Sequence, residues 1–246
     1  MSFDPSAPLP GAPDPWAGSE MPALRDGPPW AMTEMIASEP ALAGRLVPRL
    51  TADPALGRVA DAVREAAARG ETITVTGCGT SHHAALAIAS LIRGGLADNG
   101  QRTDGVRAAQ AFELTGSPPT PGVVIAVSHE GGTEATNRSL AHAGGRDAPT
   151  ALITVSDRSP GAALARDVLT TGEQDQSWCH TVGYLSPLVV GACLRAAVRG
   201  ETLSAHAVAD QVAAGSDSSA AEGAAAALAG ADRLLIVGSG ADWAAA

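Results

Sequence analysis

The sequence contains no lysine, because all 16 of its basic residues are arginine. A P-loop needs a lysine on the phosphates of its nucleotide, so nucleotide hydrolysis of that type is excluded. Schiff-base catalysis needs a lysine amine, so no covalent imine forms on a side chain of this chain. Any sugar chemistry here depends on carboxylates, histidines and hydroxyls, or on a lysine from another chain.

Cysteine is scarce as well, and no export or membrane segment is evident. The three cysteines, Cys78, Cys179 and Cys193, have no Cys-x-x-Cys spacing, which argues against a disulfide framework or a zinc site and favours a reducing cytoplasm. No charged-then-apolar segment opens the chain, and its apolar runs fall short of the roughly 20 residues of a membrane span. A net charge of −10 opposes non-specific binding to nucleic acid. We therefore expect no nucleic-acid or membrane partner and no metal or cofactor.

The alternation of strand and helix patterns indicates an α/β fold. Apolar β-forming runs predict strands at 72–77, 106–114, 122–128 and 150–156, and a short helix running into a strand at 161–171. Helices are expected between them, at 53–70, 80–93, 133–143 and 181–199. The best-marked helix has Asp53 as N-cap, Pro54 at its first position and Gly70 at its end. Continuous apolar strands alternating with helices predict a parallel sheet covered on both faces.

Four segments make up the expected organisation. Residues 1–30 are rich in proline and should form an irregular arm. Residues 31–52 should form two short lead-in helices with a break at Pro40. The main domain is expected at 53–200, followed at 201–246 by an alanine-rich helical linker and a new strand in "DRLLIVGSG" (232–240).

Two glycine turns invite a dinucleotide-binding interpretation, which the next residues oppose. "GCGTSH" (77–82) and "GSGADW" (238–243) place His82 and Trp243 where the third glycine of G-x-G-x-x-G would permit close packing of helix on strand. His83 likewise takes the last glycine position of a G-x-S-x-G nucleophile elbow.

Two strand ends instead share the chemistry of an anion site. "GCGTS" offers the amide of Gly79 with the hydroxyls of Thr80 and Ser81, and "SHEGGT" (128–133) offers two hydroxyls and the amides of Gly131 and Gly132. Free N–H groups and short hydroxyl side chains at helix N-termini bind anions without a lysine. The alternative is that these hydroxyl residues are ordinary N-caps with no ligand. The occurrence of two such loops favours a site.

Four stretches carry a family resemblance that covers about residues 32–200. They are "MTEMIASEPALAGRL", "ITVTGCGTSHHAALAIASLI", "VVIAVSHEGGTEATNRSLAHA" and "EQDQSWCHTVGYLSPL". In this order and spacing the chain resembles the SIS (sugar isomerase) domain, the phosphosugar-binding module of glucosamine-6-phosphate synthase and related sugar-phosphate isomerases and deaminases. The resemblance implies a doubly wound, flavodoxin-like sheet of five parallel strands flanked by helices. It also implies a homodimer and a sugar-phosphate or amino-sugar-phosphate ligand.

The resemblance also implies which residues bind the ligand. The family's phosphate ligands fall on Thr80, Ser81, Ser128, His129, Glu130 and Thr133. The chain departs from the family at three positions. Glu130 and His180 each stand where the family has a serine, and Val182 stands where it has a lysine. At ~5 Å and an effective dielectric of ~20, a carboxylate repels a phosphate by roughly 3 kcal/mol per unit charge. Glu130 must therefore cap backbone amides, pair with His129 or an arginine, or face a cation or hydroxyl of the ligand.

Whether the chain is an enzyme stays open at this stage. The last residues resemble the beginning of a second SIS domain, while the family's isomerisation carboxylate, ring-opening histidine and Schiff-base lysine lie further on. Within this chain the candidates for proton transfer are Glu130, Glu173 and His180. One hypothesis is an aldose–ketose isomerase or amino-sugar deaminase-like enzyme. The other is a sensor or degenerate homologue that binds a sugar phosphate without converting it.

Overall fold

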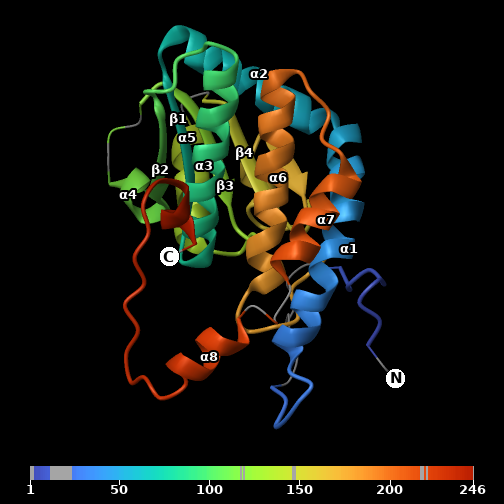
Figure 1. Ribbon diagram of the computed structural model, residues 1–246. Coiled ribbons are helices and arrows are strands. Elements are labelled where there is room, and N and C mark those ends of the chain that lie inside the picture. Colours follow the sequence, from blue (N-terminus) through green and yellow to red (C-terminus); the bar gives the residue numbers. More distant parts are fainter. Residues whose placement is uncertain are drawn as a thin grey trace.

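A parallel sheet of five strands lies at the centre of the computed structural model (Figure 1), which describes residues 3–11, 24–116, 118, 120–145, 148–216, 219 and 221–245. The strands lie in the order β2-β1-β3-β4-β5, and each pairs in parallel with its neighbours. Their bounds are β1 Thr72–Gly77, β2 Val106–Gln110, β3 Gly122–Val127, β4 Thr150–Thr154 and β5 Asp167–Thr170. The predicted α/β fold with five parallel strands is confirmed.

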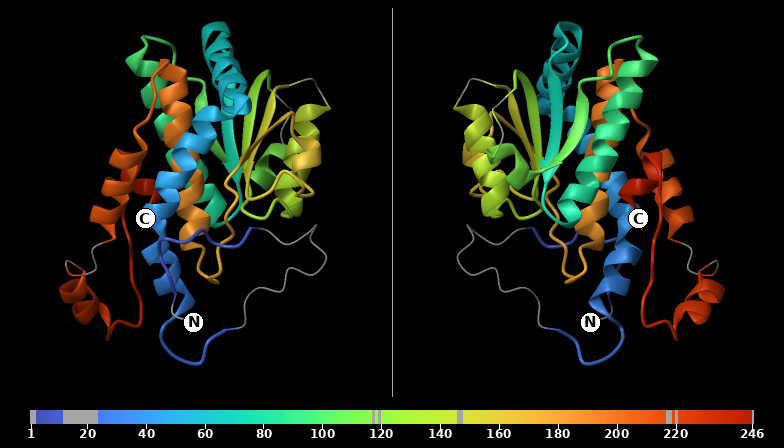
Figure 2. Two further views of the ribbon diagram at one scale, coloured as in Figure 1. Left: turned by 90° about the vertical axis from the view of Figure 1, so that its right-hand side faces the viewer. Right: turned by 90° about the vertical axis from the view of Figure 1, so that its left-hand side faces the viewer.

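Helices cover both faces of the sheet, as a doubly wound fold requires (Figure 2). α2, α3 and α6 pack on one face and α4 and α5 on the other, while α1 and α7 pack beside α6. The bounds are α1 Ala31–Ala52, α2 Pro54–Arg69, α3 Thr80–Asp98, α4 Ala111–Thr115, α5 Glu134–Gly144, α6 Thr181–Arg199, α7 Ala205–Gly215 and α8 Glu222–Leu228. Two 3-10 turns, η2 Ala162–Leu164 and η4 Gly240–Ala244, complete the described elements.

The apolar core is unequal on the two sides of the sheet. Ile73 and Val75 of β1 are fully buried in the larger cluster, with side chains of α2, α3 and α6. The smaller cluster, beneath α5, consists of Ala126, Leu140, Leu152 and Ala162. Since burying one Leu or Ile side chain stabilises a fold by about 1.5–3 kcal/mol, the larger cluster supplies most of the apolar stabilisation.

α1 corrects the expectation of two short helices separated at Pro40. The helix runs unbroken from Ala31 to Ala52, with Pro40 and Pro48 inside it. An internal proline removes a hydrogen bond and costs about 3 kcal/mol. The buried face of the helix, which includes Leu42, Leu46 and Leu50, packs against α6 and α7 and offsets that cost.

The local sequence pattern predicted the ends of α2 correctly but placed the end of β2 too late. Asp53 accepts a hydrogen bond from the Ala55 amide at 2.8 Å, and Gly70 ends α2 in the left-handed conformation. The strand expected over 106–114 stops at Gln110, because α4 follows at once. The Glu113 carboxylate accepts the Gln110 amide at 3.0 Å and so favours a helical turn there.

The strand expected in residues 232–240 does not form. The residues here adopt no regular structure before η4, and Leu235 and Val237 are 91% and 83% exposed. A strand needs a hydrogen-bonded neighbour, and this segment pairs with none of the five described strands. Figure 1 shows it as a long loop that returns to the start of α3, where η4 packs.

α6 is the one helix of the described chain that is long and apolar enough to cross a membrane. Its apolar window is 61% buried inside the protein. The helix contacts α1, α2 and α3, so its composition is that of a core helix.

Candidate ligand-binding site

The candidate site lies where the strand order reverses. β1 and β3 are neighbours in the sheet, but β1 continues into α3 on one face and β3 into α5 on the other. Their carboxyl ends therefore border the crevice at which open α/β sheets bind ligands. Thr136 in the first turn of α5 donates a hydrogen bond to the Cys78 sulfur at 3.9 Å, which places the two predicted loops side by side.

The loop after β1 ends in a helix N-terminus without a side-chain cap. Gly79 precedes α3 with φ of 55°, and Thr80 and Ser81 form the first turn of the helix. Gly77 is required here, because a Cβ at its position would lie 2.7 Å from the Ser81 backbone. Thr80 is exposed and Ser81 is half-buried, and neither caps the helix. The ordinary N-cap interpretation therefore does not apply to them.

The loop after β3 is similar. Gly131 has φ of 69°, and a Cβ there would lie 2.2 Å from the Ser159 hydroxyl, so only glycine fits. Ser128 is buried, and its hydroxyl donates to that of Thr133 at 3.4 Å. Thr133 precedes α5 without capping it with its side chain. The amides of Thr133, Glu134 and Ala135 have no acceptor among the residues that the structure describes, so α5 also presents free donors.

Glu130 is not neutralised in the way the sequence suggested. Its half-buried carboxylate has no hydrogen bond and no ion pair with any residue in the described ranges. The expected capping of backbone amides and the expected pairing with His129 or an arginine are therefore both absent there. No residue in the described ranges therefore offsets the charge of Glu130.

His129 points toward α6 and joins a polar cluster there. Its Nε2 accepts a hydrogen bond from the Asp175 amide at 3.0 Å, so that nitrogen carries no proton and the ring is neutral. Burial lowers the pKa of His129 to about 4, with the Asp175 carboxylate opposing and His180 reinforcing the shift. The Asp175 side chain accepts from Ser177 and from the Gly183 amide, which anchors the N-terminus of α6. His129 therefore positions α6 and is not placed as a cationic phosphate ligand.

His180 stands at the start of α6 in a conformation that is uncommon for a side chain larger than glycine. Its φ and ψ are 51° and 49°, in the left-handed region. Its ring packs edge-on to that of His129, with centroids 5.9 Å apart. Its Nδ1 is buried without a hydrogen-bond partner. A strained backbone and an unsatisfied ring nitrogen are typical of a residue held for a ligand.

A cavity of about 460 Å³ connects two of the predicted residues, Thr80 and His180. Residues of α1, α3, α6 and the C-terminal segment line it, among them Glu39, His83 and Tyr184. The other predicted residues, Gly79, Ser81, Ser128, His129, Glu130, Gly131, Gly132 and Thr133, are not among its described lining. The Ala244 carbonyl lies 3.2 Å from His83 Nδ1 and accepts from the Tyr184 hydroxyl at 2.9 Å, so Ala244 and Ala245 form one wall.

Glu39 is the side chain at this cavity that sequence reasoning missed. Burial raises the pKa of its carboxyl to about 7, with a further contribution from the Asp175 carboxylate. It has no hydrogen bond and no ion pair with the described residues. Its position immediately before Pro40, within the lead-in segment that resembles the family, was the available signal. A carboxyl with a pKa near neutrality in a cavity is suited to proton transfer.

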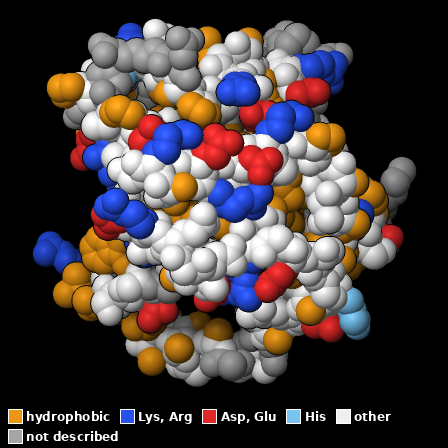
Figure 3. All heavy atoms as spheres, turned by 90° about the horizontal axis from the view of Figure 1, so that it is seen from above, with side chains coloured by type: hydrophobic (Ala, Val, Ile, Leu, Met, Phe, Trp, Pro, Cys, Tyr) orange, Lys and Arg blue, Asp and Glu red, His pale blue; other side chains and the backbone are white. Residues whose placement is uncertain are grey.

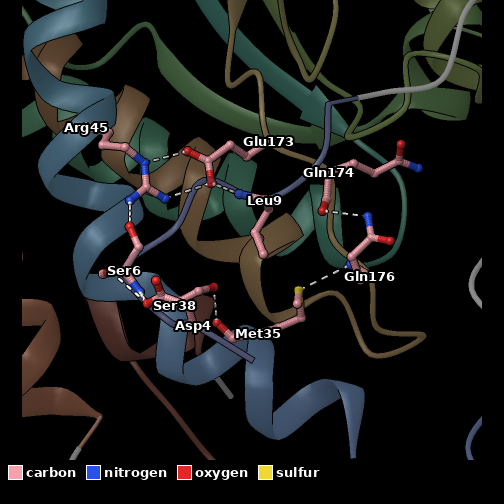
Figure 4. Close-up of polar contacts among 9 residues, drawn as sticks. All are labelled: Asp4, Ser6, Leu9, Met35, Ser38, Arg45, Glu173, Gln174 and Gln176. Carbon is pink, nitrogen blue, oxygen red and sulfur yellow. Dashed lines mark hydrogen bonds and ion pairs between the residues drawn. The ribbon is translucent and has the colours of Figure 1, made fainter. Parts of the chain in front are cut away.

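Glu173, the third candidate for proton transfer, has a structural role instead (Figure 4). Arg45 donates to both of its carboxylate oxygens at 2.9 Å, and the Leu9 amide donates to one of them at 2.9 Å. Figure 4 shows this carboxylate enclosed between α1 and the N-terminal arm, residues 3–11. A doubly bound, half-buried ion pair fixes the loop before α6 and does not present a free base.

Comparison with known proteins supports the fold. The sequence matches no protein-family model, and no curated protein is significantly similar to it. A structure from Silicibacter pomeroyi DSS-3, provisionally described as a phosphosugar isomerase, matches with a TM-score of 0.66 and 17% identity, over 87% of this chain and 64% of that one. The C-terminal domain of glucosamine-fructose-6-phosphate aminotransferase from Francisella tularensis matches with a TM-score of 0.58 and 15% identity, over 78% and 54%.

A third structure, provisionally described as a sugar binding protein from Salmonella typhimurium LT2, has a TM-score of 0.50 and 25% identity, over 68% of this chain and 49% of that one. The chain thus spans about two thirds of the first structure and about half of the other two. The chain therefore shares the α/β fold of these solved structures.

Proposed function

We propose that this protein binds a sugar phosphate, with the phosphate at the N-termini of α3 and α5. The observation that carries the proposal is the pairing of two helix N-termini, both without side-chain caps, at the reversal of strand order. Each presents the positive end of a helix dipole, and α5 adds the free amides of Thr133, Glu134 and Ala135, whereas the amides of Ser81 and His82 in α3 donate to the Cys78 and Gly79 carbonyls. The sugar-related descriptions of the similar structures agree with this ligand class.

The partner-free carboxylate of Glu130 supports an amino sugar over a neutral one. An ammonium group of the ligand would offset the repulsion between Glu130 and the phosphate, which a neutral sugar does only through hydroxyls. Glucosamine 6-phosphate should therefore bind more tightly than glucose 6-phosphate.

A thermal-shift and calorimetric screen with fructose, glucose, glucosamine and galactosamine phosphates tests this function. A ligand at 100 times its dissociation constant adds ~2.7 kcal/mol of stability. Ser81→Ala with Thr133→Ala should weaken binding by ~1–3 kcal/mol through lost charge-assisted hydrogen bonds. Ser204→Ala is the matched control, since this hydroxyl caps α7 away from the site. If the double variant bound the sugar phosphate as tightly as the wild type, the phosphate would not bind at these two residues.

Aldose–ketose isomerisation is a second candidate, which Glu39 favours over a passive sensor. Glu39 would take the C2 proton of the open-chain sugar and return it to C1, while a histidine of the cavity moves the hydroxyl proton. The carbonyl then passes from C1 to C2 with no external oxidant. Proton NMR in D₂O would show solvent deuterium entering the sugar with the wild type. Glu39→Gln should stop this exchange yet keep the affinity, and Glu34→Gln, on the same helix, should leave both unchanged.

Location and assembly belong to the same proposal. The free thiols of Cys78, Cys179 and Cys193 agree with a reducing cytoplasm. A homodimer is proposed from the resemblance to the SIS family. α6 is largely covered by α1 and α3 of its own chain, so it leaves little apolar surface for a partner. Sedimentation that shows only a folded monomer at high concentration would count against the dimer.

A further inference from the structure

A second cavity lies at the opposite, amino-terminal edge of the sheet, away from the proposed sugar-phosphate site. It measures about 550 Å³ and is larger than the cavity beside Thr80. The starts of β1 and β3 line it, together with β2 and the second half of α5. Figure 3 views the molecule from the side on which the strands begin, and basic and acidic side chains are interspersed on that surface.

The polar face of β1 explains why this cavity exists. β1 reads Thr72-Ile-Thr74-Val-Thr76, so its apolar side chains enter the larger core and its threonines face the other side. A strand buried in a parallel sheet is normally apolar on both faces. On this side of the sheet α4, which has only 5 residues, packs against β2 and α5. Thr72 and Thr74 therefore border a cavity on this side of the sheet instead of an apolar core.

The cavity carries positive charge in an acidic protein. Arg107 lies opposite Thr74 in the register of β1 and β2, and its Nε donates to the buried Thr74 hydroxyl at 3.1 Å. The Arg107 guanidinium has no ion pair with the described residues, although its geometry suits a carboxylate or a phosphate. Glu71 is the one carboxylate in the described lining, and it is paired with Arg69 at 2.9 Å.

An unsatisfied buried nitrogen adds an independent indication of a ligand. His142 of α5 lines the cavity, and its Nε2 is buried without a hydrogen-bond partner. A buried polar group without a partner costs about 1–3 kcal/mol. Apolar walls complete the cavity, from Leu114 of α4 and Val124 of β3. Positive charge, an unpartnered ring nitrogen and apolar walls together suit an anion with an apolar body.

We propose that this cavity is a second ligand site, for a small organic anion bound by Arg107 and His142 through its charged group and by Leu114 and Val124 through its apolar part. The site does not depend on the sugar-phosphate proposal, because it shares no lining residue with the cavity beside Thr80.

Benzoate is a suitable probe, with benzyl alcohol as its neutral counterpart. Titration calorimetry and amide chemical shifts are measured at low salt, with and without saturating glucosamine 6-phosphate. Benzoate should bind in both conditions and shift the amides of Thr72, Thr74 and Val124. Benzyl alcohol should bind at least tenfold more weakly. A loss of benzoate binding when the sugar phosphate is present would show that the probe occupies the other site, and would overturn the proposal.

Three variants separate recognition from stability. Arg107→Gln and His142→Gln should each weaken benzoate binding, the former at least tenfold, without changing the affinity for the sugar phosphate. Arg102→Gln is the control, because Arg102 is an exposed arginine already paired with Asp104 at 2.7 Å. Undiminished benzoate binding in Arg107→Gln would show that Arg107 does not hold the probe, and no binding to the wild type would show that the cavity holds water only; either result would overturn the proposal.

Discussion

Replacing Glu39 by glutamine should change how the stability of the protein depends on pH. The pKa of this carboxyl is about 7 in the folded chain against 4.5 without its environment. The folded state therefore binds the proton of Glu39 more tightly than the unfolded state does. The resulting contribution to the free energy of unfolding is fully present below pH 4.5. It is lost as pH rises through the folded pKa of about 7, where the charged carboxylate destabilises the fold.

The magnitude follows from the same pair of values. At 1.36 kcal/mol per pH unit the difference corresponds to roughly 3 kcal/mol. Glu39 is only half-buried, so solvent screening reduces this to about 1–2 kcal/mol. The glutamine variant, which has no charge to bury, should therefore gain about 1–2 kcal/mol over the wild type at pH ~8 relative to pH ~5. For a chain of this size that is a rise in Tm of about 2–4 °C per kcal/mol.

Urea unfolding followed by circular dichroism, at pH values between about 5 and 8, measures the effect. Glu34→Gln is the matched control on the same helix, because Glu34 is paired with Arg25 at 2.6 Å outside the cavity. His129 moves stability in the opposite direction but is common to all three proteins. If the difference between wild type and Glu39→Gln were the same at every pH, the environment assigned to Glu39 would be wrong.

Three further results are expected. Glu130→Ser should tighten the binding of a neutral sugar phosphate by ~1 kcal/mol at low salt, since it removes a facing charge; unchanged calorimetric affinity would place Glu130 outside the site. His129 should stay neutral well below pH 6.5, with its proton on Nδ1, and its share of the stability should be lost as pH falls from 6.5 toward 4; ring ¹⁵N shifts that titrate near 6.5 would contradict this. Glu173→Gln should cost ~1–3 kcal/mol, because it leaves Arg45 and the Leu9 amide poorly paired, and it should speed protease cleavage near residues 3–11; an unchanged cleavage rate would show that the arm is held by other contacts.

The sequence predicted the features that depend on neighbouring residues. The strands β1 and β3, the caps of α2 and the glycine loops that follow β1 and β3 depend on local sequence, and each lies where it was expected. The break at Pro40 was wrong because packing on α6 and α7 is stronger than the local preference of proline. Glu39 escaped prediction because its raised pKa arises from burial and from Asp175, which is distant in the sequence.

Glu173 shows a second limit of prediction from sequence, namely the role of a side chain. A glutamate after a strand is a reasonable candidate for a base, and nothing nearby in the sequence shows that Arg45 and Leu9 will enclose it. The partner-free state of Glu130 is equally non-local, since it depends on which donors other loops bring within reach. The roles of side chains at the site therefore depend on tertiary contacts, whereas the strands and loops that carry them can be predicted from local sequence.

The N-terminal arm has a consequence for the order of events during biosynthesis. Leu9 and Glu173 are 164 residues apart in the sequence, yet the amide of one binds the carboxylate of the other. At about 5–20 residues per second, a ribosome needs roughly 10–30 s to produce the second partner after the first. Through that interval Leu9, which is only 8% exposed in the finished protein, has no Glu173 loop to cover it. The arm is made first and docks late, so the loop that orients the start of α6 acquires its final tether only when most of the domain has been translated.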